Sequence, residues 1–170
     1  MILKSELIIK EFFLDSEANI LESIYLINQS NTPEVGDLGS FDDLIKLLRL
    51  SFANFYLSYD NKVIGFIVCF RESSDYWSQN YKFFSNNTEK FLYIDRIAVK
   101  KEFRRNNLAS DLYKYVEKKV NYENLPLCCE VNIKPLNKAS IKFHYKYGFK
   151  NNTKHFDFQI KYFFTQNFLS

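Results

Sequence analysis

Three titratable side chains lie in segments that are otherwise mostly apolar. Asp95 falls within the run Phe91–Val99, Glu130 falls within Leu127–Ile133, and His144 falls in a stretch with helical spacing. Carboxylates and an imidazole are groups that move protons in general acid–base catalysis. A buried, unpaired carboxylate is costly, so Asp95 needs either a partner, such as a nearby Lys or Arg, or a chemical task.

His144 is expected to point inward from its helix. Lys138, Lys142 and Lys146 recur every four residues and form one solvated stripe, and Ser140 and His144 sit almost opposite that stripe. An inward histidine is more often a satisfied core residue than a catalytic one. The pattern alone therefore leaves both interpretations of His144 open.

A basic turn follows the strand that carries Asp95. Five positively charged residues lie within ten positions there: Arg96, Lys100, Lys101, Arg104 and Arg105. The turn leads into a helix, whose N-terminus offers unpaired backbone N–H groups and a positive dipole end that suit a phosphate. The segment is compatible with a multiply phosphorylated ligand, but a solvated basic turn would show the same pattern.

This turn resembles the Arg/Gln-x-x-Gly-x-Gly/Ala turn of the GNAT superfamily of acyl-CoA-dependent N-acetyltransferases. Asn107 stands where the family usually has Gly, and Asn tolerates a glycine-like backbone better than most residues. The resemblance implies that the backbone of this turn holds the coenzyme A pyrophosphate and that the preceding strand end bonds the pantetheine arm. The residues so assigned are Arg104, Arg105, Asn106, Asn107, Leu108, Ala109 and Ser110 for the turn, and Ile97, Ala98 and Val99 for the strand.

A second stretch, from Asn137 to Phe149, is similar to the family's Asn-x-x-Ala-x-x-Phe-Tyr-x-x-x-Gly-Phe, with Ser140 in place of the Ala and His144 in place of the Tyr. The resemblance implies that Asn137, Ser140 and His144 contact the cofactor, and that His144 protonates or hydrogen-bonds the departing sulfur. An imidazolium of pKa about 6.5 could protonate a thiolate whose thiol has a pKa of about 8.5. A closer resemblance, to a little-characterised branch known only as predicted acetyltransferases, is carried by residues 91–99, 128–137 and 143–149, with Asn80, Tyr81 and Phe84 of the long connection.

The resemblance also concerns the general base. Tyr93 or Asp95 matches the strand position that in the family often relays the amine proton. In some peptide N-terminal acetyltransferases of the family a Glu serves as the base at the position of Asn132, whereas here the Glu lies two residues earlier, at Glu130. The base stays open between Asp95 and Glu130, acting directly or through water, with His144 as the third catalytic candidate. Tyr93 and Asn132 are expected on the substrate side.

Residues 71–90 form a long connection without clear periodicity, and such loops in compact domains are usually functional or disordered. Their aromatic side chains argue against disorder. These side chains could cap the core or form a wall of the substrate site. Tyr76, Trp77 and Tyr81 are the candidates for facing the acetyl group.

The elements that must position these residues follow a β-α-α-β-β-β-α-β-α-β-β order, which indicates an α/β domain around a mixed sheet. The expected ranges are strand 5–13, a helix through 20–27, helix 41–50, hairpin 53–59 with 63–70, strand 91–99, helix 107–120, strand 127–133, helix 137–147, and two short strands near 149 and 156–164. The resemblance covers about residues 5–165. It implies a single domain, residues 1–170, with the GNAT fold: a central mixed, largely antiparallel sheet of about seven strands flanked by about four helices.

The composition limits the classes of function. With 23 Lys and Arg against 20 Asp and Glu, the net charge of +3 is too small for a duplex-binding surface, so no nucleic-acid partner is expected. Cys69, Cys128 and Cys129 form no CxxC pair, which suggests reduced thiols in a cytoplasmic protein, and two histidines without a cysteine cluster make no metal site. The chain shows no signal-peptide pattern and no apolar run long enough for a membrane span, so no membrane partner is expected.

The sequence therefore predicts an N-acetyltransferase that uses acetyl-CoA as co-substrate, without a metal. The acetyl group would pass by direct attack to the primary amine of a small-molecule or amino-acid-like acceptor. One alternative is a non-catalytic acyl-CoA-binding module, and another is a peptide N-terminal acetyltransferase. Edge strands of this fold often pair into dimers, so a homodimer is an option.

Overall fold

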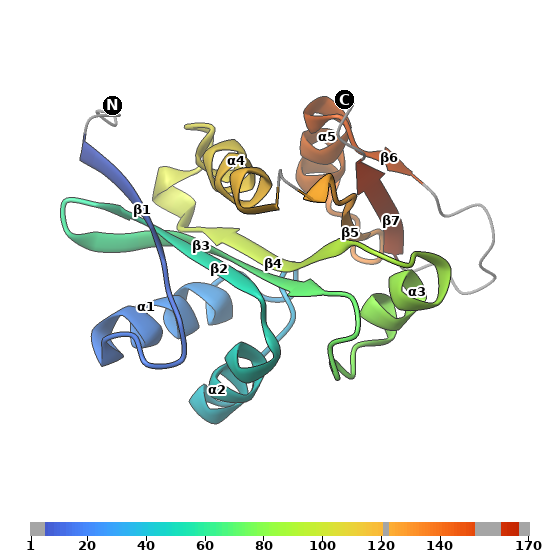
Figure 1. Cartoon of the computed structure of the whole chain (residues 1–170). Coiled ribbons are helices and arrows are strands. Elements are labelled where there is room, and N and C mark those ends of the chain that lie inside the picture. Colours follow the sequence, from blue (N-terminus) through green and yellow to red (C-terminus); the bar gives the residue numbers. More distant parts are fainter. Residues whose placement is uncertain (1–5, 121–122, 152–160, 167–170) are drawn as a thin grey trace.

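The computed structural model describes residues 6–120, 123–151 and 161–166. The strands described there form a seven-stranded sheet in the order β1-β2-β3-β4-β5-β7-β6 (Figure 1). Among these strands, β4 and β5 pair in parallel and all other neighbours pair antiparallel, which confirms the expected mixed, largely antiparallel sheet.

The elements follow one another along the chain with bounds close to those expected. They are β1 (Leu7–Glu11), α1 (Ala18–Gln29), α2 (Phe41–Leu50), β2 (Ala53–Tyr59), β3 (Lys62–Arg71), α3 (Gln79–Asn87), β4 (Leu92–Val99), η2 (Lys101–Phe103), α4 (Leu108–Val120), β5 (Leu127–Asn132), α5 (Lys138–Tyr147), β6 (Lys150–Asn151) and β7 (Lys161–Gln166). Of the last expected strand, residues 156–160 lie outside the described residues.

The connection over residues 71–90 differs from expectation because it contains helix α3. Ser78 caps this helix by accepting a hydrogen bond from the Tyr81 backbone N–H, and Tyr81 and Phe84, three positions apart, are its buried residues. A Ser cap followed by apolar residues at a spacing of three is a recognisable start signal, but it spans little more than two turns. With α3 the described part of the chain has five α-helices, whereas the sequence predicted about four.

Helices cover both faces of the sheet. One apolar cluster joins α1 and α2 to side chains such as Phe66 and Val68, and a second joins α4 to side chains such as Ile67 and Cys69. Figure 1 shows α1 and α2 on one side of the sheet and α4 and α5 on the other. Successive residues of β3 therefore serve opposite clusters, as the alternation of a strand buried on both faces requires.

A bulge in β4 sets the direction of its polar side chains. Val68 of β3 pairs with Arg96, but the next residue, Cys69, pairs with Ile94, so Asp95 is an extra residue of β4. An extra residue shifts the alternation of the strand. Asp95 and Arg96, which would otherwise face opposite sides, both turn toward the α1 side, where Asp95 contacts Tyr76 and Arg96 contacts Asn28.

Gly65 of β3 allows β4 to approach closely at the end that leads into the basic turn. A Cβ atom added at this position would lie 3.0 Å from the Ala98 carbonyl oxygen and 3.2 Å from Val99 Cγ2. Gly65→Ala should therefore lower the free energy of unfolding by about 1–2 kcal/mol, since a filled site must shift backbone atoms. Urea unfolding measures this change. Gly36→Ala is the matched control, because its Cβ would meet only Arg96 Nη2, at 3.9 Å; equal stability losses in both variants would contradict the close-approach argument.

Candidate active site

A cleft opens where β4 and β5 part. The two strands pair at only three positions, from Leu92 with Leu127 to Ile94 with Cys129, and both continue beyond the last pair. The cleft has a volume of about 810 Å³. Its walls come from the far ends of β4 and β5, the start of α4, the start of α5 and the loop between α1 and α2.

The basic turn forms one end of this cleft. Arg105 and Asn107 have positive φ angles of 66° and 60°, the left-handed conformation expected where Asn replaces Gly. In the described part of the chain no backbone acceptor is recorded for the N–H groups of residues 105–110, whereas Asp111 already bonds to the Asn107 carbonyl. The turn thus presents a run of backbone donors at the positive end of α4, which is a suitable surface for an anion.

The side chains of the turn divide into two groups. Most of the predicted cofactor residues line the cleft: Ile97, Ala98, Val99, Arg104, Arg105, Asn107, Leu108, Ala109, Ser110, Asn137, Ser140 and His144. Asn106 is not among the lining residues, because its amide donates to the carbonyls of Phe103 and Arg104 and closes the turn. The Arg104 guanidinium folds back, with Nη2 2.6 Å from Asn31 Oδ1 and Nε 3.2 Å from the Val99 carbonyl oxygen.

His144 lies at the inner wall of the cleft with 3% of its surface exposed. Nδ1 is 2.8 Å from the Ser140 carbonyl oxygen, which can only accept, so Nδ1 carries the proton. Nε2 therefore accepts a hydrogen bond from the hydroxyl of Tyr113, at 2.8 Å. Both ring nitrogens are engaged within the protein.

Burial lowers the pKa of His144 from its ordinary value of 6.5 to about 4, although the bond to Ser140 acts in the opposite direction. The expectation that an imidazolium protonates the departing sulfur is therefore not supported, because the ring is neutral at neutral pH. Tyr113 is the residue that sequence reasoning missed. It lies on the buried face of α4, lines the cleft, and burial raises its pKa well above the usual range.

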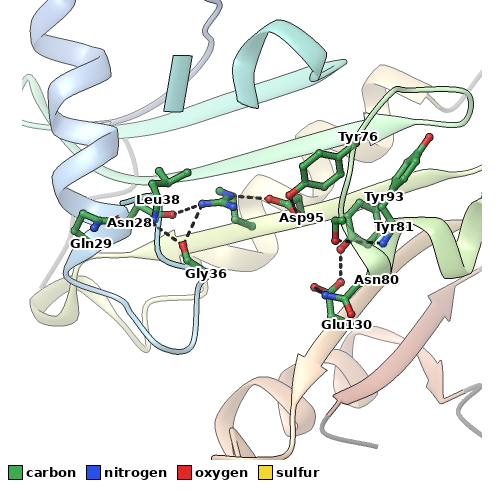
Figure 2. Close-up of polar contacts among 12 residues, drawn as sticks. Asn28, Gln29, Gly36, Leu38, Tyr76, Asn80, Tyr81, Tyr93, Asp95 and Glu130 are labelled. Carbon is green, nitrogen blue, oxygen red and sulfur yellow. Dashed lines mark hydrogen bonds and ion pairs between the residues drawn. The ribbon is translucent and has the colours of Figure 1, made fainter. Parts of the chain in front are cut away.

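The two candidate carboxylates have different partners (Figure 2). Glu130 accepts hydrogen bonds from the Tyr93 hydroxyl at 2.5 Å and from Asn80 Nδ2 at 3.0 Å. Asp95 accepts a hydrogen bond from the Tyr76 hydroxyl at 2.6 Å and forms an ion pair with Arg96 Nε at 2.7 Å. The ion pair that the sequence allowed for Asp95 is confirmed.

A second hollow of about 580 Å³ adjoins the cleft, and we call it the side pocket. It shares Gly36, Asp95, Arg96 and Glu130 with the cleft. The other lining residues come from the α1–α2 loop, from α2 and from the segment before and within α3: Asp37, Leu38, Gly39, Asp43, Leu47, Tyr76, Trp77, Ser78 and Asn80. The two hollows meet at the carboxylates.

The predicted substrate residues fall in different places. Tyr76 and Trp77 line the side pocket, with Trp77 55% exposed, and Asn132 lines the cleft and donates to the Pro33 carbonyl. Tyr81 and Tyr93 line neither hollow, because both are buried in the core. Tyr81 accepts from the Ser74 N–H and donates to the Arg71 carbonyl, so its hydroxyl closes the loop before α3. Sequence reasoning missed Asn80 and the α1–α2 loop.

The three cysteines lie in the protein core. Cys69, Cys128 and Cys129 are free and buried, and burial raises the pKa of each thiol. Residues 6–120, 123–151 and 161–166 contain no group of three or more His, Cys, Asp or Glu side chains that could hold a metal ion. Within the same ranges, no helix has the length and apolar character needed to cross a bilayer.

The sequence profile of the Acetyltransferase (GNAT) family matches residues 21–149. The comparison with curated proteins returned no match. Among solved structures, the chain is similar to Ard1 from Thermoplasma volcanium, with 21% identity, a TM-score of 0.68, and 97% of this chain and 99% of that chain covered.

Two further structures share the fold. One is the ribosomal-protein-S18-alanine N-acetyltransferase from Escherichia coli, with 16% identity, a TM-score of 0.66, and 95% and 93% of the two chains covered. The other is a GNAT family acetyltransferase from Elizabethkingia anophelis with acetyl-CoA bound, with 15% identity, a TM-score of 0.63, and 97% and 100% covered. Identities this low show a common fold.

The low pKa of His144 predicts a pH-dependent loss of stability. Between about pH 6.5 and pH 4 the unfolded chain binds a proton at this residue that the folded chain does not, so stability falls as the pH falls. The contribution amounts to about 2 kcal/mol between pH 7 and pH 5. Urea unfolding of the wild type and of His144→Phe at both pH values measures it as a difference. Identical pH dependences would show that the ring titrates normally in the folded protein.

Proposed function

Because the chain belongs to the GNAT acetyltransferase family, we propose that it transfers the acetyl group of acetyl-CoA to the primary amine of a small or amino-acid-like acceptor. Acetyl-CoA is the co-substrate typical of this family. It would supply the acetyl thioester. The observation that supports the proposal most directly is the meeting of two hollows, one ending in an anion-binding turn, at a pair of carboxylates.

The cleft fits a long ligand with a phosphorylated end. The donors of residues 105–110 would hold the pyrophosphate, and the left-handed backbone at Asn107 lets the phosphates approach the main chain. The side of β4 that faces β5 has no partner strand beyond Ile94, so the backbone of Ile97 to Val99 can bond an extended amide-containing arm. An arm bound in this way would have its reactive end near Glu130 and Tyr113, which line the same cleft.

We assign proton removal from the acceptor to Glu130. It lies where the cleft meets the side pocket, and its oxygens accept hydrogen bonds from the Tyr93 hydroxyl and from Asn80 Nδ2, which orient the carboxylate. Asp95 is placed as a positioning residue, because its two oxygens are engaged by Tyr76 and Arg96. Attack by a bound, deprotonated amine on a bound thioester gains chiefly from orientation.

The departing sulfur would meet a neutral environment. Tyr113 lines the cleft, and His144 Nε2 orients its hydroxyl by accepting a hydrogen bond from it. Tyr113 would hydrogen-bond the sulfur by turning its one O–H away from His144 Nε2, and because the imidazole is neutral and the tyrosine pKa is raised, the pair is a poor source of a full proton. His144 is therefore proposed to act through Tyr113.

The side pocket suits a cationic acceptor. Asp37, Asp43 and Glu130 line it; among the described lining residues the one cation is Arg96, which is paired with Asp95, and Asp43 pairs with Lys46. An amine arrives at neutral pH as an ammonium ion, which carboxylates attract. Trp77 supplies an exposed ring beside the same pocket.

Release of free thiol from acetyl-CoA, measured with a panel of acceptors, tests the function. The panel contains diamines, amino acids and their amides, and short peptides with a free N-terminus. The proposal expects turnover with at least one small or amino-acid-like amine, above the rate with peptides. Turnover with peptides alone would reassign the chain as a peptide N-terminal acetyltransferase, and acetyl-CoA binding without turnover on any amine would refute the proposal.

Asn107 tests the position of the cofactor. Asn107→Val should weaken acetyl-CoA binding about tenfold, because a β-branched residue resists the left-handed conformation and crowds the approach of a phosphate. Asn107→Gly, which adopts that conformation readily, should bind within about twofold of the wild type. Isothermal titration calorimetry gives both affinities. Equal affinities for all three proteins would place the phosphates elsewhere.

Glu130 and Asp95 can be separated as candidates for the base. Glu130→Gln keeps the shape and the acceptor oxygen toward Tyr93 but cannot take a proton, so kcat should fall about 100-fold. The acetyl-CoA dissociation constant should stay within about threefold of the wild type, because the change removes no binding contact of the turn. Asp95→Asn, as the paired variant, should retain the larger kcat in steady-state assays. The reverse order would assign the proton transfer to Asp95.

A further inference from the structure

We infer that Arg96 is a positioning residue: it holds the α1–α2 loop, residues 30–40, against the transfer site and thereby sets the affinity for the acceptor. The inference rests on the proposed acetyl transfer. Arg96 lies in β4, before the basic turn, and its side chain faces the α1 side of the sheet. The bulge at Asp95 gives it that direction.

The guanidinium of Arg96 joins three separate parts of the chain. Nε lies 2.7 Å from Asp95 Oδ2, and Nη1 lies 2.9 Å from Asn28 Oδ1 and 3.3 Å from the Gly36 carbonyl oxygen. These contacts are the dashed lines that run from Asn28 and Gly36 to Asp95 in Figure 2. Arg96 is only 8% exposed. Buried ion pairs of this kind contribute little net stability compared with apolar packing, so stability alone does not explain a charged group here.

The loop side of this contact is a chain of carboxamides at the end of α1. Asn28 Nδ2 donates to the Gly36 carbonyl at 3.0 Å and to Gln29 Oε1 at 2.9 Å. Gln29 Oε1 accepts from the Leu38 backbone N–H at 3.2 Å, and Gln29 Nε2 donates to Asp37 Oδ1 at 2.7 Å. Arg96 therefore fixes the loop through Gly36 directly and through Asn28 indirectly.

The loop so held forms part of both hollows. Pro33, Glu34, Val35 and Gly36 line the cleft, and the segment from Gly36 to Gly39 lines the side pocket. On its other side Arg96 reaches Asp95, whose second oxygen holds the Tyr76 hydroxyl on the opposite wall. One guanidinium thus links both walls of the side pocket. The backbone donors of residues 105–110 do not contact this guanidinium, and the turn reaches the loop separately, through Arg104 and Asn31.

Loss of Arg96 should therefore change the affinity for the acceptor but not the affinity for acetyl-CoA. Loss of the guanidinium should let the loop and the Tyr76 wall move apart, which weakens acceptor binding, while the backbone donors for the cofactor stay in place. In Arg96→Gln the acceptor KM should rise at least tenfold, with the acetyl-CoA dissociation constant within about threefold of the wild type. Arg96→Lys keeps the charge but not the planar fork of donors, so its acceptor KM should lie between that of the wild type and that of Arg96→Gln.

A matched control separates positioning from simple destabilisation. Val68→Ala removes a buried side chain directly opposite Arg96 in β3 and lowers stability without touching the polar contacts. Asn28→Ala approaches the contact from the loop side, since Asn28 is fully buried and lines neither hollow. The inference expects a raised acceptor KM in Asn28→Ala and an unchanged one in Val68→Ala. If Arg96→Gln does not fold, Asn28→Ala and Arg96→Lys decide by the same criterion.

Amide hydrogen exchange gives a readout that needs no acceptor. In Arg96→Gln or Asn28→Ala the amides of residues 30–40 should exchange at least tenfold faster, while those of α4 should not change. If the wild type turns over no amine, the proposed function fails and hydrogen exchange still tests whether Arg96 holds the loop. Unchanged exchange of the loop, an unchanged acceptor KM, or an equal KM rise in Val68→Ala would each overturn the inference.

Discussion

The site depends on one extra residue in β4. Without the bulge at Asp95, strict alternation would turn either Asp95 or Arg96 toward the α4 side, into a cluster of side chains such as Ile67 and Ile94. With it, both side chains face the α1 side and neutralise each other at 2.7 Å. The same strand then continues to Val99 and delivers the chain into the turn before α4. Asp95, Arg96 and the turn before α4 are therefore positioned by one strand, whereas Glu130 comes from β5.

Two buried tyrosines each pair with a residue of the cleft. Tyr93 is fully buried, and its hydroxyl donates to Glu130; Tyr113 is fully buried, and its hydroxyl donates to His144. A polar group removed from water needs a hydrogen-bond partner. Each tyrosine therefore fixes the orientation of one cleft residue from the core side. The buried tyrosines thus hold Glu130 and His144 in place, although only Tyr113 itself reaches the cleft.

Much of the fold could be predicted from the sequence because its signals are local. The strand alternation, the Asp60-Asn61 turn with its two positive φ angles, and the left-handed Asn107 depend on neighbouring residues. The partners of the site residues could not be predicted, because Arg96 meets Asn28 across 68 positions and Tyr93 meets Glu130 across 37. The neutral state of His144 likewise follows from burial against α4, which no spacing in α5 reveals. Helix α3 was missed because its apolar spacing covers too short a segment.

The narrow junction between β4 and β5 has a thermodynamic consequence. Among the described residues, three pairs join the strands β1 to β4 to the strands β5 to β7, and beyond Ile94 and Cys129 the two described strands form no further pairs across the cleft. A bound amide-containing arm would supply main-chain bonds there and act as part of the sheet. Folding and ligand concentration are then linked, with a gain of about 2.7 kcal/mol when the ligand is present at 100 times its dissociation constant. Under such conditions the metabolic supply of the co-substrate would help determine what fraction of the protein is folded in a cell.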